Sequence, residues 1–417
     1  MNFIDRLLLF TFPFMDVGFN AFGVPFRLGE LTFFLTFLRL IDLAPILNIS
    51  KVHKAGLVLI FLMVTNLILT ILFSRFENID SPFYVKYILR NALYLLVMIS
   101  YLLKPIKFDK IKGESFIKYI LYVILIFYII EYIDFYLVSL NWDSIFVSRQ
   151  GKSIFGNFII RFSGPSSEPA YIIPLLSIPL MYGLQTRKFK VIILSLILMI
   201  LPFSSFGYVA IVFALLYFLN NIVDKELKRK IWKGVFSGMV FCCILCILFF
   251  NRISEIFAYN WLKFQAYFGL GDAYEWSASQ RIGHVKLAFN LFLEAPFINM
   301  LFGNGTGYYS KMSKEFTKYY LDDAEEAHSL FFSTLTDRGF VGVLLLLFMF
   351  YAITKIRIPR NISEQNKFFF IAIKFGVLVR MLHWVFTGML WQYYFWVEVA
   401  ILLSASIYYI KVFNENQ

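Results

Sequence analysis

Charged residues are scarce in this 417-residue sequence, at 16% of the chain. Soluble globular proteins carry about 25%. The deficit accompanies 59% hydrophobic residues, 51 phenylalanines and a mean hydropathy of +0.70. So little polar side-chain surface cannot cover a soluble fold of this size, which excludes that class. The composition predicts an all-α polytopic membrane protein that forms a single membrane domain over residues 1–417.

Cysteine and cofactor motifs are also scarce. The three cysteines fall in one apolar run, which favours buried packing residues over a disulfide framework or a metal site: Cys242, Cys243 and Cys246. Neither His-Glu-x-x-His nor Asp-x-Asp occurs, and no Gly-Lys-Ser/Thr follows the glycine cluster Gly303–Gly307. We therefore expect no metal, no nucleotide and no cofactor. The first apolar run lacks a small-residue cleavage pattern and is expected to remain as an anchor.

The apolar runs have the length of transmembrane helices. A spanning helix needs roughly 20 mostly apolar residues. The chain offers Leu7–Phe22, which Pro13 breaks, and then Leu28–Leu47, Ala55–Phe73, Phe83–Leu103, Phe116–Leu140, Pro169–Leu184, Val191–Leu219, Trp232–Phe250, Ser329–Thr354, Phe368–Thr387 and Met389–Ile410.

The basic residues set the orientation of these helices. The net charge is +12, and five short loops hold clustered lysines and arginines. Such loops face the cytoplasm and anionic lipid head groups, so the charge indicates membrane lipids as partners and not nucleic acid. Placing all five on one side requires Val191–Leu219 to cross twice, with a turn near Pro202–Gly207. The prediction is about twelve crossings, both termini in the cytoplasm, and the polar segments 141–168 and 251–327 outside.

The large outer loop, 251–327, lies between the ninth and tenth predicted helices and contains an amphipathic helix. In Ser279–Glu294 the residues Ile282, Val285, Phe289 and Phe292 follow a helical stripe, while Arg281 and His284 share another face. The helix is expected to end before Pro296. The alternative for this element is a helix that lies on the membrane surface.

Several ionisable residues stand where a membrane makes charge expensive, which marks functional candidates. Several also have a structural alternative: Arg90 can pair with Glu131 or Asp134, Arg380 can snorkel to head groups, and Glu398 can form a hydrogen bond between helices. Asp337–Arg338 can form a local ion pair that lets Gly339 approach a neighbour. The residues predicted to converge on the outer side are Arg90, Arg161, Glu168, His328, Arg380, His383 and Glu398.

Arginines beside a histidine on a lipid-bounded face suit one kind of chemistry. The guanidinium group binds phosphate oxygens through a bidentate fork. Neutral imidazole can take a proton from a hydroxyl near neutral pH. Together they favour displacement of a phosphate-type leaving group on a lipid carrier by a hydroxyl.

Three segments carry a family resemblance. QRIGHVKLAFNLFLEAPFINMLFGNGTGYY, followed after a polar gap by AHSLFFSTLTDRGFVGVLL, resembles the signature of the bacterial O-antigen polymerase/ligase superfamily. RFSGPSSEPAY resembles the segment those proteins carry before a central helix. The plan of many helices with one large outer loop near the end fits the same superfamily.

The resemblance implies a metal-independent, inverting glycosyltransferase of the GT-C type in the bacterial inner membrane. Its donor would be a glycan linked through pyrophosphate to undecaprenol at the periplasmic leaflet, and a chain-length regulator protein would be a partner. Carried over by position, Arg281 would hold the pyrophosphate and His328 would act as the base or orient the acceptor hydroxyl. Arg161 and Arg380 would also bind the pyrophosphate. The supporting residues would be Glu168, His284, His383 and Arg90.

The resemblance leaves three functions open. Ser329 follows His328 where many relatives, ligases in particular, have asparagine, which favours a Wzy-type polymerase of O-antigen or related surface polysaccharide. The first alternative is an O-antigen ligase that transfers glycan to lipid A–core. The second is a flippase or transporter of lipid-linked sugar, against which the outer-side bias of the charges argues.

Overall fold

A computed structural model gives the fold of the protein. The residues that it describes are 3–14, 16–21, 24–36, 54–73, 79–103, 113–137, 153–154, 159–166, 168–221, 229, 265, 276–316, 327–358, 362–385 and 393–415. The predicted crossing Trp232–Phe250, the cysteines and most of segment 141–158 lie outside these residues. The prediction of twelve crossings therefore stays a prediction.

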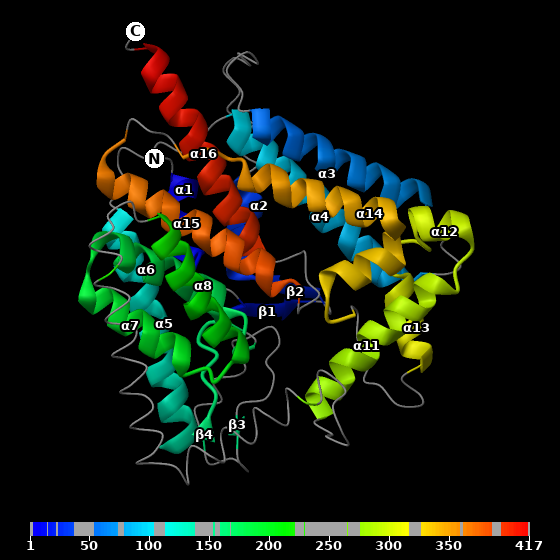
Figure 1. Ribbon diagram of the computed structural model, residues 1–417, viewed down its shortest axis with the longest axis horizontal. Helices are drawn as coiled ribbons and strands as arrows, with labels where there is room; N and C mark the ends of the chain where they lie inside the picture. Colours follow the sequence, from blue (N-terminus) through cyan, green and yellow to red (C-terminus); the bar gives the residue numbers. More distant parts are fainter. Residues whose placement is uncertain are drawn as a thin grey trace.

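Helices dominate the described part of the chain (Figure 1). Two short antiparallel hairpins, which the sequence did not predict, accompany them: β1 (Gly18–Ala21) with β2 (Val24–Arg27), and β3 (Ser153–Ile154) with β4 (Ile159–Ile160). The helices are α1 (Phe3–Thr11), α2 (Leu28–Leu35), α3 (Lys54–Phe73), α4 (Ser81–Leu103), α5 (Gly113–Tyr136), α6 (Ile172–Thr186), α7 (Phe189–Ile200), α8 (Ser205–Asn221), α11 (Trp276–Leu293), α12 (Phe297–Phe302), α13 (Tyr308–Phe316), α14 (Leu330–Thr354), α15 (Glu364–His383) and α16 (Tyr393–Glu415).

Four helices are long and apolar enough to cross a membrane, by length and composition: Lys54–Phe73, Tyr84–Leu103, Gly113–Tyr136 and Leu330–Thr354. Shorter apolar helices include α6, α7, α8 and most of α16. Many large apolar side chains on these helices are exposed, such as Phe61, Leu72 and Phe348. Exposed apolar surface of this extent fits lipid contact and agrees with a polytopic membrane protein.

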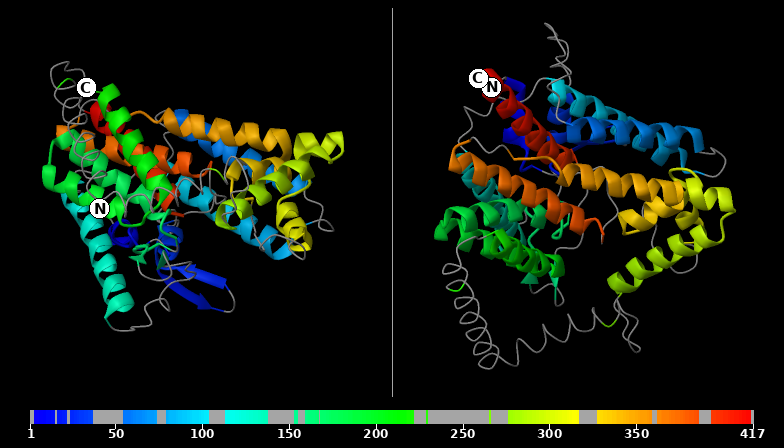
Figure 2. Two further views of the ribbon diagram at one scale, coloured as in Figure 1. Left: turned by 60° about the horizontal axis from the view of Figure 1, so that its bottom comes forward. Right: turned by 45° about the horizontal axis from the view of Figure 1, so that its top comes forward.

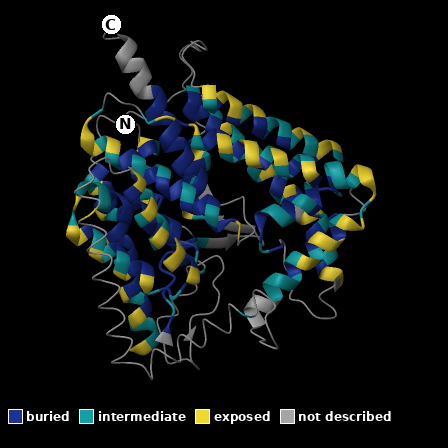
Figure 3. Cartoon of the chain, viewed as in Figure 1, coloured by how far each residue is buried: buried dark blue, intermediate teal, exposed yellow. Residues whose placement is uncertain are grey.

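The core lies where α6, α15 and α16 meet. α6 packs against α5, α7, α8 and α15, and α16 packs against α4 and α15. Figure 3 shows these central helices mainly in the colour of buried residues and the outer helices with exposed faces. Gly376 allows the close approach of α15 to α6, because a Cβ there would lie 2.4 Å from the Ile178 side chain.

The N-terminal prediction is wrong in part. The run Leu7–Phe22 does not form one span, because α1 ends at Thr11 and the chain then enters the β1–β2 hairpin. Pro13 cannot continue a helix, and the sequence from Gly18 onward has turn-forming residues. In the run Leu28–Leu47, α2 accounts for Leu28–Leu35, and residues 37–47 lie outside the described part.

The turn predicted within Val191–Leu219 is confirmed, because two separate helices occupy this run. α7 ends at Ile200 and α8 begins at Ser205, with Pro202 and Phe203 in the turn between them. Phe203 has a left-handed backbone, with φ 47°. Two helices joined by a tight turn agree with the predicted turn, and the two membrane crossings stay a prediction.

A second layer surrounds α14. Figures 1 and 2 show α14 beside α3, and α11, α12 and α13 pack against α14. The helix predicted within Ser279–Glu294 is confirmed as α11, but its buried side chains are His284, Ala288 and Leu291. The stripe used for the prediction does not face this core, since Phe289 is 43% exposed. Leu287 is the partly buried residue of α11 that packs against this cluster, and the centroid of the Phe289 ring lies 6.2 Å from that of the Phe332 ring of α14.

Candidate active site

His328 lies at the junction between segment 317–326 and α14. Its backbone is left-handed, with φ 51°, which is uncommon for a residue with a side chain and costs on the order of 1–3 kcal/mol. Hydrogen bonds on both sides hold this conformation: the Ala327 amide donates to Ser333 Oγ at 2.8 Å, and the Leu330 amide donates to the Trp384 carbonyl at 3.1 Å. Backbone strain maintained in this way is typical of functional positions.

His284 and Tyr309 support the His328 ring. The His284 and His328 rings meet edge to face, with centroids 5.2 Å apart. Nδ1 of His284 lies 2.6 Å from the Tyr309 hydroxyl oxygen, and both residues are fully buried. Arg281 and His284, predicted to share one face of the helix, differ in burial: His284 is buried beside His328, whereas Arg281 is half-buried.

Asp337 and two glycines fix the segment that carries Tyr309. The Asp337 carboxylate accepts hydrogen bonds from the amides of Gly307 and Tyr309, each at 2.8 Å. Gly339 kinks α14 at φ 64°, and a Cβ there would lie 2.5 Å from the Leu301 carbonyl oxygen. Gly303 is equally constrained, since its Cβ would lie 2.2 Å from the Asp337 carbonyl oxygen. The glycine cluster is thus a docking turn for α14.

The proposed ion pair between Asp337 and Arg338 is wrong, but the proposed role of Gly339 is confirmed. Gly339 does allow close approach of a neighbour, but Asp337 binds backbone amides. Arg338 instead donates to Asn66 Oδ1 at 2.7 Å and to Thr334 Oγ1 at 3.2 Å, and its guanidinium lies 5.1 Å from the Tyr87 ring centroid. Arg338 joins α14 to α3 and α4.

Arg281 is the charged residue that influences several of the candidate site residues. It lies on α11 and is half-buried. Its positive charge acts on His328, on Glu168 and on His383. Three segments that are far apart in sequence thus lie within range of this charge: the loop before α6, the start of α14 and the end of α15.

The loop before α6 is anchored by its backbone. The Glu131 carboxylate on α5 accepts hydrogen bonds from the amides of Ser163 and Gly164 at 3.1–3.3 Å. The Asp16 amide donates to the Pro165 carbonyl at 2.9 Å. Glu131 therefore holds this loop, and the alternative that paired Arg90 with Glu131 or Asp134 is wrong, because Arg90 pairs with Glu30.

This loop presents Arg161 and Glu168. Arg161 Nε donates to the Pro202 carbonyl at 3.5 Å, and its charge also acts on Glu168. Burial raises the pKa of the Glu168 carboxyl, while the Arg281 charge opposes that rise. A hydrogen bond with the Tyr171 side chain further favours the carboxylate.

The imidazole of His328 is neutral at physiological pH. Burial lowers its pKa from 6.5 to about 4, and the charge of Arg281 and the neighbouring His284 add to this shift. Neutral imidazole can accept or donate a hydrogen bond. An anion bound at Arg281 would offset the nearby positive charge and raise the basicity of His328.

Arg380 and His383 lie in the last turn of α15. Arg380 is fully buried, donates to Glu398 Oε1 at 2.9 Å and stacks on the Tyr394 ring at 4.2 Å. The snorkelling alternative is therefore wrong, and direct pyrophosphate contact by Arg380 would require Glu398 to release it. His383 is buried between Tyr171 and Phe206, with ring centroids 5.5 and 4.4 Å away.

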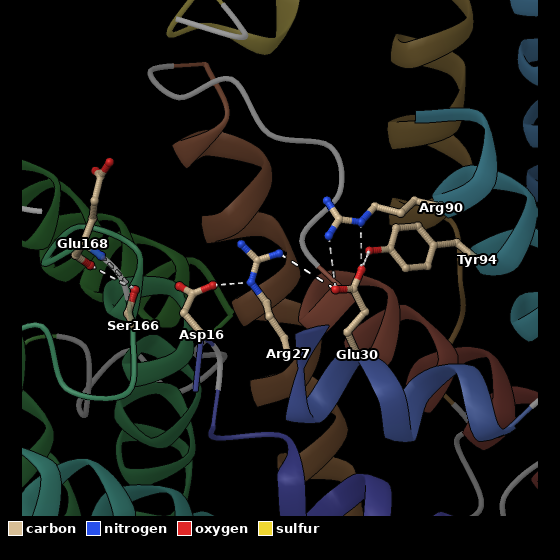
Figure 4. A network of polar contacts seen from close by, with 7 residues as sticks. All are labelled: Asp16, Arg27, Glu30, Arg90, Tyr94, Ser166 and Glu168. Atoms are coloured by element: carbon tan, nitrogen blue, oxygen red, sulfur yellow. Dashed lines mark hydrogen bonds and ion pairs between the residues drawn. The ribbon is translucent and has the colours of Figure 1, made fainter. Parts of the chain in front are cut away.

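Arg90 belongs to a network that the sequence did not predict. Its Nε lies 3.1 Å from Glu30 Oε1, and the Tyr94 hydroxyl donates to the same oxygen at 3.1 Å. Glu30 also lies 4.0 Å from Arg27, whose Nε donates to Asp16 Oδ1 at 2.6 Å (Figure 4). Asp16 in turn acts electrostatically on Glu168. The network contacts the loop before α6 through Asp16, whose amide donates to the Pro165 carbonyl at 2.9 Å, while its carboxylate repels that of Glu168.

Residues 191–347 match the family model for O-antigen ligase. No curated protein matches the chain. The matched segment contains Arg281, His284 and His328, while Arg161, Glu168 and Arg380 lie outside it. The match confirms the resemblance to the O-antigen polymerase/ligase superfamily and indicates a glycosyl-transferring function with lipid-linked glycan substrates.

Proposed function

We propose that the protein is a Wzy-type polymerase. It transfers a growing glycan from undecaprenyl pyrophosphate to the terminal sugar of the next lipid-linked repeat unit, as a metal-independent, inverting glycosyltransferase of the GT-C type. The observation that carries the proposal is the position of Arg281, whose charge acts on both the neutral, strained His328 and the carboxylate of Glu168. The charge of Arg281 thus acts on two groups that can accept a hydrogen bond or a proton from an acceptor hydroxyl.

The reaction assigns separate tasks to these groups. Arg281, assisted by Arg161, binds the pyrophosphate oxygens and stabilises the charge that develops as the bond from the anomeric carbon to the phosphate oxygen breaks. His328 orients the acceptor hydroxyl or takes its proton. His284 positions His328, and His383 and Arg90 support the surrounding structure. Because Arg380 is paired with Glu398, its task is to hold α15 and α16 together below the site.

The proposal includes a location. The protein spans the bacterial inner membrane with both termini in the cytoplasm, and segment 251–327 lies in the periplasm. The exposed apolar faces of α3, α5 and α14 support membrane insertion, and the basic short loops support the orientation. A chain-length regulator protein is the proposed partner in the same membrane.

The test is the length distribution of surface polysaccharide in cells that carry His328→Ala or Arg281→Ala in place of the wild-type protein. Both variants should lose the ladder of long chains and retain single repeat units. Arg357→Ala, which removes an exposed arginine after α14, is the matched control and should leave the ladder intact. Wild-type chain lengths in both site variants, at equal protein levels, would end the assignment of these residues.

An O-antigen ligase is the second candidate, because the family model that matches residues 191–347 is described by that activity. Deletion of the gene separates the two. A polymerase deletion leaves lipopolysaccharide that carries one repeat unit, whereas a ligase deletion leaves lipid A–core without repeat units.

A further inference from the structure

Most carboxylates near the candidate site are engaged in structural contacts. Asp16 lies 2.6 Å from Arg27, and Glu30 lies 3.1 Å from Arg90. Glu398 lies 2.9 Å from Arg380 and Glu131 accepts two backbone amides. Each of these groups has a partner that stabilises its negative charge and that would oppose protonation.

Glu168 differs from them. In the described part of the chain it makes no ion pair within 4.0 Å; its partners are the Tyr171 side chain and, at longer range, the charges of Arg281 and Arg161. Figure 4 shows its carboxylate directed away from the chain of ion pairs that links Asp16 to Arg90. Glu168 is thus the carboxylate placed beside the proposed pyrophosphate-binding arginines and left available to a ligand.

The backbone holds Glu168 in a defined place. Ser166 Oγ donates to the Glu168 carbonyl at 3.0 Å, and the Tyr171 amide donates to the same oxygen at 3.1 Å. Glu131 and Asp16 fix the preceding residues of the loop, as described above. A catalytic group needs such support, because a displacement of about 1 Å can cost on the order of 100-fold in rate.

We propose that Glu168 is the general base of the transfer and that His328 is the hydrogen-bond partner that orients the acceptor hydroxyl. The assignment rests on the proposed function and deepens it. The acceptor hydroxyl gives its proton to the Glu168 carboxylate as its oxygen bonds to the anomeric carbon of the donor. The bond from that carbon to the phosphate oxygen breaks, and undecaprenyl pyrophosphate leaves with the electron pair. Glu168 then releases the proton to water.

The two candidate bases differ in basicity in the direction that this assignment requires. Burial is the largest cause of the low pKa of His328, about 4, so its imidazole stays a weak proton acceptor at neutral pH even where a bound anion offsets the charge of Arg281. Burial raises the pKa of Glu168 above its usual value, toward the range in which a carboxylate is an effective general base. The charged groups that face Glu168 are Arg281, Arg161 and Asp16.

The test compares donor binding with turnover in full-length protein in lipid nanodiscs. Glu168→Gln should bind undecaprenyl pyrophosphate at least as tightly as the wild type, because a negative charge near the arginines is removed, and should lower the turnover of lipid-linked repeat units by ~100-fold or more. Glu168→Ala should regain turnover when formate supplies a carboxylate, which a residue with only a structural role would not show. Glu364→Gln, the same change at an exposed position, is the matched control.

The outcomes separate this role from the function on which it rests. Turnover by Glu168→Gln within about threefold of an active wild-type protein would overturn the role of Glu168 alone. Loss of undecaprenyl pyrophosphate binding in Glu168→Gln, or failure of formate to restore Glu168→Ala at any pH, would also overturn it. A folded wild-type protein that leaves the repeat units unchanged would remove the proposed function, and this role with it.

Discussion

The hydroxyl oxygen of Tyr309 lies 2.6 Å from Nδ1 of His284, and this contact joins α13 to α11 directly behind His328. Removal of the hydroxyl by Tyr309→Phe leaves a buried ring nitrogen without this partner, which costs about 1–3 kcal/mol of stability. We expect a lower melting temperature and reduced turnover in Tyr309→Phe. Tyr308→Phe, at the neighbouring half-buried position, is the control and should change neither. Unchanged melting and turnover in Tyr309→Phe would contradict a supporting role for the contact.

The pKa of His328 predicts an unusual titration. The chain has four histidines, so the protein with isotope-labelled histidine gives few imidazole signals, and His328→Gln identifies the one of interest. That signal should titrate near pH 4, and Arg281→Gln should move its midpoint toward 6.5, because a positive neighbour is lost. A midpoint near 6.5 in the wild-type protein would contradict the burial of this ring.

The same shift predicts how stability depends on pH. The folded pKa of about 4 lies below the unfolded value of 6.5, so the unfolded chain binds more protons between these values. The contribution of His328 to stability is therefore complete above pH 6.5 and is lost as the pH falls toward 4. Thermal unfolding in detergent across this range should show a smaller acid loss in His328→Gln than in the wild type. Equal losses would show that other groups control the acid limb.

The buried pair Arg380–Glu398 predicts non-additive substitutions. Arg380→Met leaves the Glu398 carboxylate buried and unpaired, which costs about 3–5 kcal/mol. Arg380→Met combined with Glu398→Leu removes both charges and should recover most of that loss. Chemical denaturation of the single and double variants measures the coupling. Additive losses would mean that the two side chains do not depend on each other.

The kink in α14 predicts an intolerance of side chains at Gly339. Gly339→Ala places a methyl group against the Leu301 carbonyl and requires a left-handed backbone, so we expect a loss on the order of 1–3 kcal/mol. Phe340→Ala, which truncates an exposed neighbour, should have a small effect. Melting temperatures of purified variants check this expectation. A wild-type melting temperature in Gly339→Ala would show that the kink can relax.

Local patterns in the sequence predicted much of the fold. The apolar runs that became α3, α4, α5 and α14 have both length and hydropathy, and the turn at Pro202 follows from proline chemistry and the distribution of basic loops. The hairpin after α1 was missed because a run of apolar residues hides its turn signal. The face of α11 was misassigned because one of its buried residues is the polar His284, which a search for an apolar stripe passes over.

The candidate site was also predicted in part from local sequence patterns. Arg281, His328 and Glu168 stand out as polar residues at the edges of apolar runs, and the structure brings them together. Asp16, Arg27 and Glu30 were missed, although their charges also interrupt the apolar N-terminal region and the same criterion could have marked them. Their pairing with Arg90 joins residues as far apart as Glu30 and Arg90, and no local periodicity encodes such a contact. The burial of Arg380 likewise depends on Glu398, which only the packing of α15 on α16 reveals.

The hydrogen bonds from the Asp337 carboxylate to the amides of Gly307 and Tyr309 set an order of events during biogenesis. The ribosome makes both amides before it makes the aspartate, so α13 waits without its anchor until that part of α14 has been synthesised. Maturation of the region around His328 therefore comes late in translation, and a chain that stops before Asp337 cannot assemble it.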